Sequence, residues 1–448
     1  MNLYAGLKRR AAQDQPIRVG VIGAGKFASM FFAQAIRTPG LHITVVADLA
    51  PKRARAALRR AEWRAENLRA RSASGAWRSR QTWVTDDVDA LTTCDEVDVV
   101  VDATGDAVAG AAHATAAIAA GKHVVMVNVE ADALVGPALA ARAASAGCVY
   151  SLAYGDQPAL IAEQVDWARA AGFDVVAAGK GTKYLPHYHQ VTPDDVWTHY
   201  GLSAAEAAAG GMNAKMFNSF LDGSKSAIEM AAVANACDLS VPERGLAFPP
   251  CGVDDLASVM QPRCDGGQLE RRGQVEVVSS LERDGRAVYR DLRWGVYVTF
   301  AADSDYVRRC FHEYGLPTDA NGNVASLYKP SHLIGLELGI SVASAALRGE
   351  ATGSAQAWNG DVVSVAKRDL AAGELLDGEG GYCVYGRLQS VEASLQRGAL
   401  PLGLSDGAVL KRAVKAGQVV RQRDVTLAGQ SLAVDLRAEM ARNHRRAG

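Results

Sequence analysis

Residues 18–28, RVGVIGAGKFA, constrain the fold more than any other part of this sequence. A β-branched run of strand character ends in glycines, and apolar residues at helical spacing follow it. In such a strand–turn–helix unit, Gly23 permits the tight turn and Gly25 lets the backbone approach a pyrophosphate. Ala28 lets the helix and the strand pack closely. The motif therefore predicts a nucleotide-binding turn at the start of a parallel sheet.

The next elements complete a dinucleotide fingerprint but leave the choice of nucleotide open. A helix that begins at Lys26 and Phe27 directs its N-terminus at the phosphates. Asp48 ends the second strand, where a carboxylate accepts from the ribose 2′-hydroxyl of NAD. Lys52 and Arg53 follow within reach of a 2′-phosphate, which favours NADP. Because these residues point to different cofactors, they do not decide between them.

Strand and helix patterns alternate as far as residue 150, which predicts a doubly wound parallel sheet of the α/β class. Residues 96–103 and 122–127 read as further strands between alanine-rich helices. Polar residues at the carboxyl ends of such strands lie beside the nicotinamide or its ribose. The candidates for that place are Thr104, Gly105, Asn128 and Glu130. Plain strand-ending turns are the alternative interpretation, and Glu130 is either an acid–base group or half of a structural ion pair.

Composition excludes several other classes of protein. The chain has 448 residues and a formal charge of -1, which argues against a dedicated nucleic-acid binder. Ten basic residues and two acidic ones lie between Lys52 and Arg80, and we interpret this stretch as a solvated helix with a basic face. No apolar run is long enough for a bilayer, and the N-terminus lacks a signal-peptide core. Seven cysteines without a CxxC pair fit reduced thiols, so we expect a cytoplasmic protein with no membrane partner.

A second polar region lies beyond residue 150. Residues 174–184 read as a strand that enters a glycine-bearing turn with two lysines, a place for a phosphate or carboxylate. Residues 212–236 read as one long helix with a polar stripe. A carboxylate beside a lysine keeps that lysine charged and ready to protonate a carbonyl oxygen, although a buried structural ion pair would give the same pattern. The candidates are Gly181, Lys183, Lys215, Asn218, Asp222 and Lys225.

The remaining patterns suggest how the chain is divided. Residues 275–300 read as hairpin strands around a turn at Asp284-Gly285. The segments 366–381 and 410–425 form a weak repeat, which predicts two halves of a compact β module. The arginine-rich end, from about 436, reads as a frayed tail. We therefore expect a nucleotide-binding domain over 1–150, an α+β catalytic and dimerisation domain over 151–350, and a small β domain with a tail over 351–448.

The order of these motifs resembles the homoserine dehydrogenase superfamily. The resemblance rests on GxGxxA, the strand end at Asn128, the pair Gly181-Thr182, and the helix with Asp222 and Lys225. In homoserine dehydrogenases this Asp and Lys bind the substrate and relay its proton. Two positions depart from the family: Val129 stands where the family has lysine, and Lys183 where it has asparagine. Homoserine itself is therefore disfavoured as the substrate.

A closer resemblance extends over nearly the whole chain. Five segments resemble the 1-deoxy-D-xylulose 5-phosphate reductoisomerase-like (DRL) oxidoreductases, namely GKGTKYLPHYH, MNAKMFNSFLDGSKSAIEMAAVANA, FPPCGVDDL, WGVYVTF and KRDLAAGELLDGEGGYCVYGR. The C-terminal repeat resembles an SAF-type β-clip. The resemblance implies a homodimer that uses NADPH, so NADP(H) is favoured over NAD(H). The characterised activity of the group rearranges and reduces 1-deoxy-D-xylulose 5-phosphate to 2-C-methyl-D-erythritol 4-phosphate, an isoprenoid precursor.

These observations predict an NAD(P)H-dependent oxidoreductase that reduces a small polar, phosphorylated, sugar-derived carbonyl. Lys225 with Asp222 would supply the proton, and Lys180, Lys183 and Lys215 are candidate phosphate ligands. A Mg or Mn ion is compatible with this chemistry, with Glu130, Asp156 or Glu229 as carboxylate ligands, and His187-x-His189 would suit a metal only on a strand. The alternatives are a homoserine-dehydrogenase-like reductase of another hydroxy-carbonyl and a non-catalytic protein that binds nucleotide and sugar.

Overall fold

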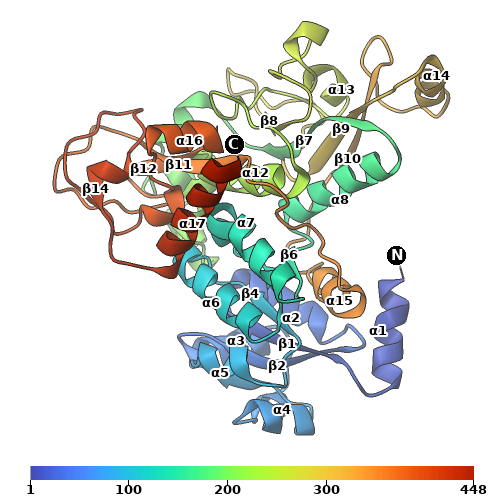
Figure 1. Ribbon diagram of the computed structural model, residues 1–448, viewed down its shortest axis with the longest axis vertical. Coiled ribbons are helices and arrows are strands. Elements are labelled where there is room, and N and C mark those ends of the chain that lie inside the picture. Colours follow the sequence, from blue (N-terminus) through green and yellow to red (C-terminus); the bar gives the residue numbers. More distant parts are fainter. Residues whose placement is uncertain (1, 448) are drawn as a thin grey trace. The chain divides into compact units, whose positions relative to one another are not determined.

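The computed structural model describes residues 2–447, which divide into two compact units (Figure 1). Unit 1 comprises Met1–Leu160, Leu333–Gln356 and Asp435–Gly448, and unit 2 comprises Ile161–His332 and Ala357–Val434. None of the helices formed by the described residues is both long and apolar enough to cross a membrane.

Unit 1 is built on a six-stranded parallel sheet with the order β3-β2-β1-β4-β5-β6. Its strands are β1 (Ile17–Ile22), β2 (Leu41–Ala47), β3 (Trp83–Thr85), β4 (Val99–Asp102), β5 (His123–Met126) and β6 (Tyr150–Leu152). The order reverses between β1 and β4, which is the switch point where ligands bind in doubly wound sheets. The predicted α/β class and Rossmann-type sheet are confirmed.

Two groups of helices pack on this sheet, α2, α3 and α15 in one and α5, α6 and α7 in the other (Figure 1). The helices of the unit are α1 (Leu3–Ala12), α2 (Lys26–Ala35), α3 (Pro51–Arg60), α4 (Ala73–Ser79), α5 (Val88–Thr93), α6 (Ala107–Ala119), α7 (Val129–Ser145) and α15 (Gly339–Arg348), with a 3₁₀ turn η1 (Ala65–Leu68). The basic stretch from Lys52 to Arg80 is therefore not one helix but α3, η1 and α4. Its buried positions are apolar, as at Ala57 and Leu58, and most of its basic side chains are exposed.

The arginine-rich end of the chain is not frayed. It forms helix α17 (Leu432–Ala447), with Leu436 fully buried and Arg437 nearly so. The Arg437 guanidinium donates to the Leu134 carbonyl at 3.1 Å, and Arg142 pairs with Glu439 at 2.8 Å. One of the arginines that suggested a frayed tail, Arg437, anchors the helix by donating a hydrogen bond to a backbone carbonyl.

Unit 2 contains a four-stranded mixed sheet with the order β10-β9-β7-β8. Its strands are β7 (Asp174–Thr182), β8 (Gln274–Ser279), β9 (Val296–Ala301) and β10 (Val324–Lys329). The predicted hairpin over 275–300 is wrong, because β7 lies between β8 and β9 and pairs with both. The turn at Asp284-Gly285 does form, but it closes only a short local hairpin in which Leu281 faces Ala287.

Helices and short turns surround this sheet. They are α8 (Gln157–Ala170, of which Ile161 onward belongs to unit 2), η2 (Pro186–Gln190), α9 (Val196–Tyr200), α10 (Ala204–Ala209), α11 (Ala214–Leu221), α12 (Ser224–Cys237), α13 (Leu256–Val259), η3 (Arg263–Asp265) and α14 (Asp305–Glu313). Helix α12 packs on β7 and β8 and is almost entirely buried. It is the central element of the unit.

Residues 357–434, here called the C-terminal module, pack on the same helix. The module contains β11 (Gly360–Ala366), β12 (Val384–Ser390), α16 (Val391–Arg397), η4 (Leu402–Leu404), β13 (Val409–Leu410), η5 (Gln422–Asp424) and β14 (Val425–Thr426). Strands β11 and β12 pair antiparallel and both contact α12. The two copies of the sequence repeat pair with each other through Leu370 and Val414, so the predicted two-halved β module is confirmed.

Candidate functional site

The predicted nucleotide-binding turn lies between β1 and α2 in unit 1. Gly23 has a φ of 89°, and a Cβ there would lie 2.8 Å from the Ala103 carbonyl oxygen, so only glycine fits. Gly25 is the N-cap of α2, and a Cβ on it would meet nothing within 4 Å. No side chain caps this helix, which leaves its first N–H groups able to bind an anion. The turn fits a pyrophosphate.

Asp48 occupies the end of β2, but its carboxylate is largely engaged with its own unit. One oxygen accepts from the Ala24 N–H at 2.9 Å, and the other accepts from the Ala50 N–H at 2.8 Å. The Arg53 guanidinium pairs with the same carboxylate at 3.2 Å while its side chain stays two-thirds exposed. Asp48 therefore holds the turn and orients Arg53. Lys52 is exposed on the same first turn of α3.

The polar residues predicted at the ends of β4 and β5 are brought together. Asn128 donates to the Thr104 hydroxyl at 3.1 Å and to the Asp106 carbonyl at 2.8 Å, and it caps α7 by accepting from the Ala131 N–H. Thr104 in turn donates to the buried Asp102 carboxylate at 2.7 Å. Asn128 thus shapes this edge through three structural hydrogen bonds.

The other two predicted residues of this edge stand beside that network. Gly105 is exposed and has a φ of 130°, a conformation that suits glycine. Glu130 is half-buried in the first turn of α7.

In unit 2, the predicted long helix over 212–236 is broken. Helix α11 ends at Leu221, Gly223 adopts a φ of 86°, and α12 begins at Ser224. At the break, the Asp222 carboxylate accepts from the N–H of Ser224, two residues ahead, at 2.9 Å, and this bond competes with the helical pattern. Asn218, Asp222 and Lys225 consequently do not share one helix face. Lys225 lies half-buried in the first turn of α12.

The partner of Asp222 is Lys367, a residue that the sequence did not single out. The Lys367 Nζ lies 2.8 Å from the Asp222 Oδ2, and both side chains are almost completely buried. His189 donates from Nδ1 to the Asp222 carbonyl at 2.6 Å, since a carbonyl can only accept. Its Nε2 accepts from the Tyr184 hydroxyl at 3.0 Å. Burial lowers the pKa of His189. The one available signal for Lys367 was its place in the repeat.

The glycine-bearing turn with two lysines, predicted over 179–184, is instead mostly strand β7. A Cβ on Gly179 would lie 1.8 Å from the Glu276 carbonyl oxygen, and one on Gly181 would lie 2.0 Å from the Leu292 carbonyl oxygen. The glycines thus allow neighbouring backbone to approach. Lys180 points into the protein and forms a buried ion pair with Glu229. Lys180 is therefore not placed to hold an exposed phosphate, and the Glu229 carboxylate, which was a candidate metal ligand, is already paired.

Lys183, just beyond the strand, belongs to a group of cations around Tyr200. Its Nζ lies 5.8 Å from the centre of the Tyr200 ring, and the Arg293 guanidinium lies 5.9 Å from the same centre. Burial, followed by the charge of Arg293, lowers the pKa of Lys183. Lys183 donates to the His199 carbonyl, and the His199 and His187 rings lie 6.1 Å apart. Within residues 2–447 no carboxylate is within ion-pair distance of either cation.

The remaining predicted residues are less engaged. Lys215 is 44% exposed and lies 3.6 Å from Asp406 in a loose ion pair. His187 and His189 lie in the 3₁₀ turn η2 rather than on a strand, so the arrangement that would suit a His-x-His metal site is absent there. Among the described residues, no group of three or more His, Cys, Asp or Glu side chains could hold a metal ion.

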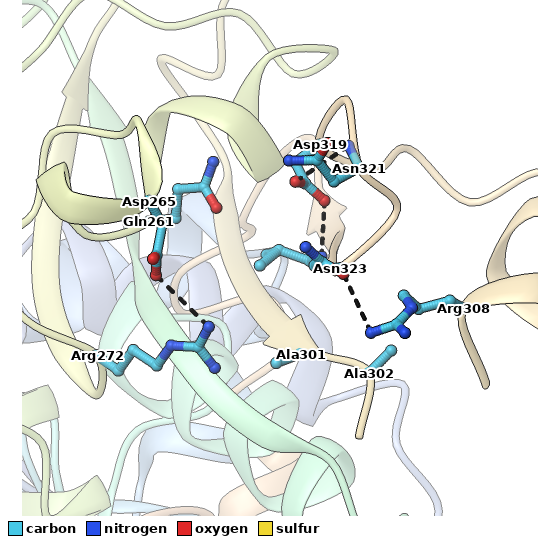
Figure 2. A pocket seen from close by; sticks show the side chains of 10 residues that line it. Gln261, Asp265, Arg272, Ala301, Ala302, Arg308, Asp319, Asn321 and Asn323 are labelled. Atoms are coloured by element: carbon cyan, nitrogen blue, oxygen red, sulfur yellow. Dashed lines mark hydrogen bonds and ion pairs between the residues drawn. The ribbon is translucent and has the colours of Figure 1, made fainter. Parts of the chain in front are cut away.

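A separate pocket of about 310 Å³ lies between β9, β10 and the turn at η3 (Figure 2). Its charges are balanced: Arg272 faces Asp265 at 3.5 Å, and Arg308 donates to Asn323 at 3.3 Å, with Asp319 nearby. None of the residues predicted from the sequence lines it. A balanced polar pocket gives no preference for an anionic ligand, so the cations around Tyr200 are the better anion site.

Comparison with known families divides the chain in the same order as its motifs. Residues 23–152 match the model of the homoserine dehydrogenase NAD-binding domain, 155–338 that of the catalytic domain of the oxidoreductase DRL, and 362–426 that of the SAF domain. The resemblance to the DRL group with a C-terminal SAF module is confirmed. No curated protein sequence matches the chain at a significant level.

Several solved structures are similar over part of the chain. Biliverdin reductase from Synechocystis sp. PCC 6803 is 20% identical, with 38% of this chain and 48% of that chain covered and a TM-score of 0.24. The 3-ketoreductase KijD10 from Actinomadura kijaniata is 21% identical, with 38% and 48% covered and a TM-score of 0.25. The Yersinia pestis protein YPO2259 is 17% identical, with 76% and 90% covered and a TM-score of 0.37. This chain thus spans about half the length of the first two.

Proposed function

We propose that this chain is an NAD(P)H-dependent oxidoreductase. The premise is that it joins a homoserine-dehydrogenase-type nucleotide-binding domain to a DRL-type catalytic domain and an SAF domain. Its substrate would be a small, anionic, sugar-derived carbonyl compound. The observation that carries the proposal is the uncapped N-terminus of α2 behind Gly23 and Gly25, because that arrangement fits a dinucleotide pyrophosphate.

NADP(H) is the proposed cofactor. The oxygens of Asp48 already accept from Ala24, Ala50 and Arg53, so little of that carboxylate remains for a ribose 2′-hydroxyl. Arg53 is held by Asp48 yet exposed, and Lys52 is exposed beside it. An oriented guanidinium suits a 2′-phosphate, because its planar fork binds phosphate oxygens in pairs.

An anionic group on the substrate is supported by the cations around Tyr200. Lys183 and Arg293 lie within 6 Å of one ring without a carboxylate partner among the described residues, and like charges brought together in this way are stabilised by an anion. This supports a phosphorylated substrate. Within the DRL group, 1-deoxy-D-xylulose 5-phosphate is the proposed substrate, and 2-C-methyl-D-erythritol 4-phosphate the product. A homodimer is proposed from the same resemblance.

The chemistry assigned to this chain is proton transfer and orientation. When bound, the nicotinamide supplies a hydride to the carbonyl carbon of the substrate. Lys225, in the first turn of α12, is the proposed proton donor to the carbonyl oxygen. Asp222 holds that first turn through the Ser224 N–H and so orients the lysine. The rearrangement that precedes reduction requires the removal of a hydroxyl proton, a step for which Lys225 is the proposed proton acceptor.

The test is NADPH oxidation, followed at 340 nm, with 1-deoxy-D-xylulose 5-phosphate and a panel of phosphosugar carbonyls, with and without Mg or Mn. Turnover of a phosphorylated substrate is expected. Lys183→Ala and Arg293→Ala should raise the KM for that substrate about tenfold and leave the KM for its dephosphorylated form unchanged, since charge-assisted phosphate contacts contribute at this level.

Other outcomes would overturn parts of the proposal. Turnover restricted to unphosphorylated hydroxy-carbonyls would favour a homoserine-dehydrogenase-like reductase. Tight nucleotide binding without turnover of any compound in the panel would favour the non-catalytic protein. A preference for NADH would contradict the role given to Arg53.

A further inference from the structure

The two copies of the repeat in the C-terminal module form a pseudo-symmetric pair. Leu370 and Val414, which occupy equivalent positions of the two copies, exchange both backbone hydrogen bonds, at 2.8 and 3.0 Å. In this alignment, Lys367 of the first copy corresponds to Lys411 of the second. Lys411 is exposed, as expected of a lysine in a β module, whereas Lys367 is buried. Lys367 of the first copy therefore has a different environment and role from Lys411 of the second copy.

The Lys367 ammonium has three partners: it forms an ion pair with one carboxylate and donates hydrogen bonds to two backbone carbonyls. It lies 2.8 Å from the Asp222 carboxylate, donates to the Gly381 carbonyl at 2.7 Å, and donates to the Val191 carbonyl at 2.9 Å. Its side chain is 2% exposed and that of Asp222 is 0% exposed, so water replaces none of these contacts. A buried cation with three fitted partners fixes the relative positions of those partners.

What Lys367 fixes is the break between α11 and α12. The carboxylate that it pairs with also accepts the Ser224 N–H, and the Val191 carbonyl that it binds is shared with the Asn218 amide at 2.9 Å. The residue after Ser224 is Lys225. The lysine thus joins three separate stretches of chain at the point where α12 begins.

The C-terminal module holds the same break through a second contact. The Gly386 N–H of β12 donates to the Ser224 hydroxyl at 2.7 Å. A Cβ on Gly386 would lie 3.2 Å from the Ser224 Cα and 2.7 Å from Leu402, so glycine is needed for this approach. The Tyr385 ring also stacks on His189 at 4.4 Å, and His189 binds the Asp222 carbonyl. Side chain and backbone of the module therefore both act on Asp222-Gly223-Ser224.

We infer that Lys367 is a positioning residue that sets the start of α12 through Asp222, and that the C-terminal module is in this way a part of the substrate site. The inference rests on the proposed function in one respect, namely that Lys225 acts on the substrate. Its structural half, the fixing of the helix break, does not depend on any activity.

The experiment compares the full-length variants Lys367→Met and Lys411→Met with the wild type. Amide hydrogen exchange over residues 218–228 should rise at least about tenfold in Lys367→Met and stay at the wild-type rate in Lys411→Met. In the NADPH assay, kcat for the phosphosugar should fall about a hundredfold in Lys367→Met, while the KM for NADPH stays unchanged. Wild-type exchange at the break in Lys367→Met would overturn the inference.

A second variant covers the case in which Lys367→Met leaves a buried, unpaired carboxylate and does not fold. Asp222→Asn/Lys367→Met removes both charges and keeps an oxygen for the Ser224 N–H. Raised exchange at 218–228 and a low kcat in this folded double variant support positioning by Lys367, and wild-type values of both overturn it. If the wild type turns over no substrate, the proposed function fails by itself, and the exchange measurement still decides whether Lys367 fixes the break.

Discussion

The nucleotide-binding turn of unit 1 and the helix break of unit 2 are two polar sites that were assembled in different ways. The first is made largely by residues close in sequence, from Gly23 to Arg53, where Asp48 accepts from the Ala24 N–H and pairs with Arg53. The second joins His189, Asp222, Lys367 and Gly386, which come from distant parts of the chain. A local motif tolerates change elsewhere in the chain, whereas an assembled site depends on every segment that contributes to it.

The largest effect is expected from Lys225→Ala in the assembled site. Loss of the proton donor should lower kcat by about 10²–10⁴, the range typical of general acid catalysis, with little change in the KM for NADPH. Steady-state kinetics with the phosphosugar measures both values. Lys415→Met is the control, because Lys415 is an exposed lysine of unit 2 in a surface ion pair with Asp369. A kcat for Lys225→Ala within threefold of the control would remove Lys225 from the mechanism.

In the local site, Gly25→Ala should separate binding from folding. A Cβ at this position meets nothing within 4 Å, so the thermal midpoint should not change. The added methyl group would occupy the place of the pyrophosphate, and the Kd for NADPH should rise at least about tenfold, or about 1.4 kcal/mol. NADPH fluorescence titration and a thermal melt measure the two properties.

Gly23→Ala is the matched contrast to Gly25→Ala. Its Cβ would collide with the Ala103 carbonyl, and its φ of 89° strains any L-residue, so we expect a lower thermal midpoint as well as weaker binding. Equal midpoints for the two variants would show that the two glycines do not have the separate roles assigned to them.

A smaller effect is expected at the ribose end of the local site. Arg53→Ala should raise the KM for NADPH about tenfold and leave the KM for NADH unchanged, since only NADPH carries the 2′-phosphate. The ratio of kcat/KM values for the two cofactors measures this. Arg59→Ala, a change at an exposed arginine at the far end of α3, should leave the ratio unaltered. A similar loss for both cofactors would mean that Arg53 serves only to orient Asp48.

The difference between the two sites also explains how much the sequence could predict. The parallel sheet and the turn at Gly23 were predictable, because the residues that determine the strand, the glycine turn and the helix lie next to one another in the sequence. The break at Asp222-Gly223 was not, since its cause is a side-chain bond that overrides helical periodicity. The sequence around Lys180 likewise predicts a phosphate ligand, and only its partner Glu229, forty-nine residues away, excludes that role. Lys367 lies farther still from Asp222, and no spacing indicates such a pair.

A further effect, on stability rather than on activity, concerns one buried carboxyl group in each unit. Burial raises the pKa of Asp132 to about 7 and that of Glu276 to about 7. Asp132 accepts from the Tyr150 hydroxyl at 3.0 Å, whereas Glu276 accepts backbone N–H groups, such as that of Val277 at 2.9 Å. Between the ordinary carboxyl pKa and about 7, the folded state therefore binds more protons than the unfolded state. Stability should consequently fall as pH rises through this window.

Each of the two groups should contribute a slope of up to about 1.4 kcal/mol per pH unit to the free energy of unfolding. Asp132→Asn and Glu276→Gln should each weaken the pH dependence of the free energy of unfolding, measured by urea unfolding from pH 5 to pH 8. Glu313→Gln, at an exposed position, should not change this pH dependence. If the two units unfold separately, the Asp132 change should act on one transition and the Glu276 change on the other. A single unfolding transition that responds equally to both substitutions would mean that the two units unfold together. The local site and the assembled site would then be lost at the same free energy of unfolding.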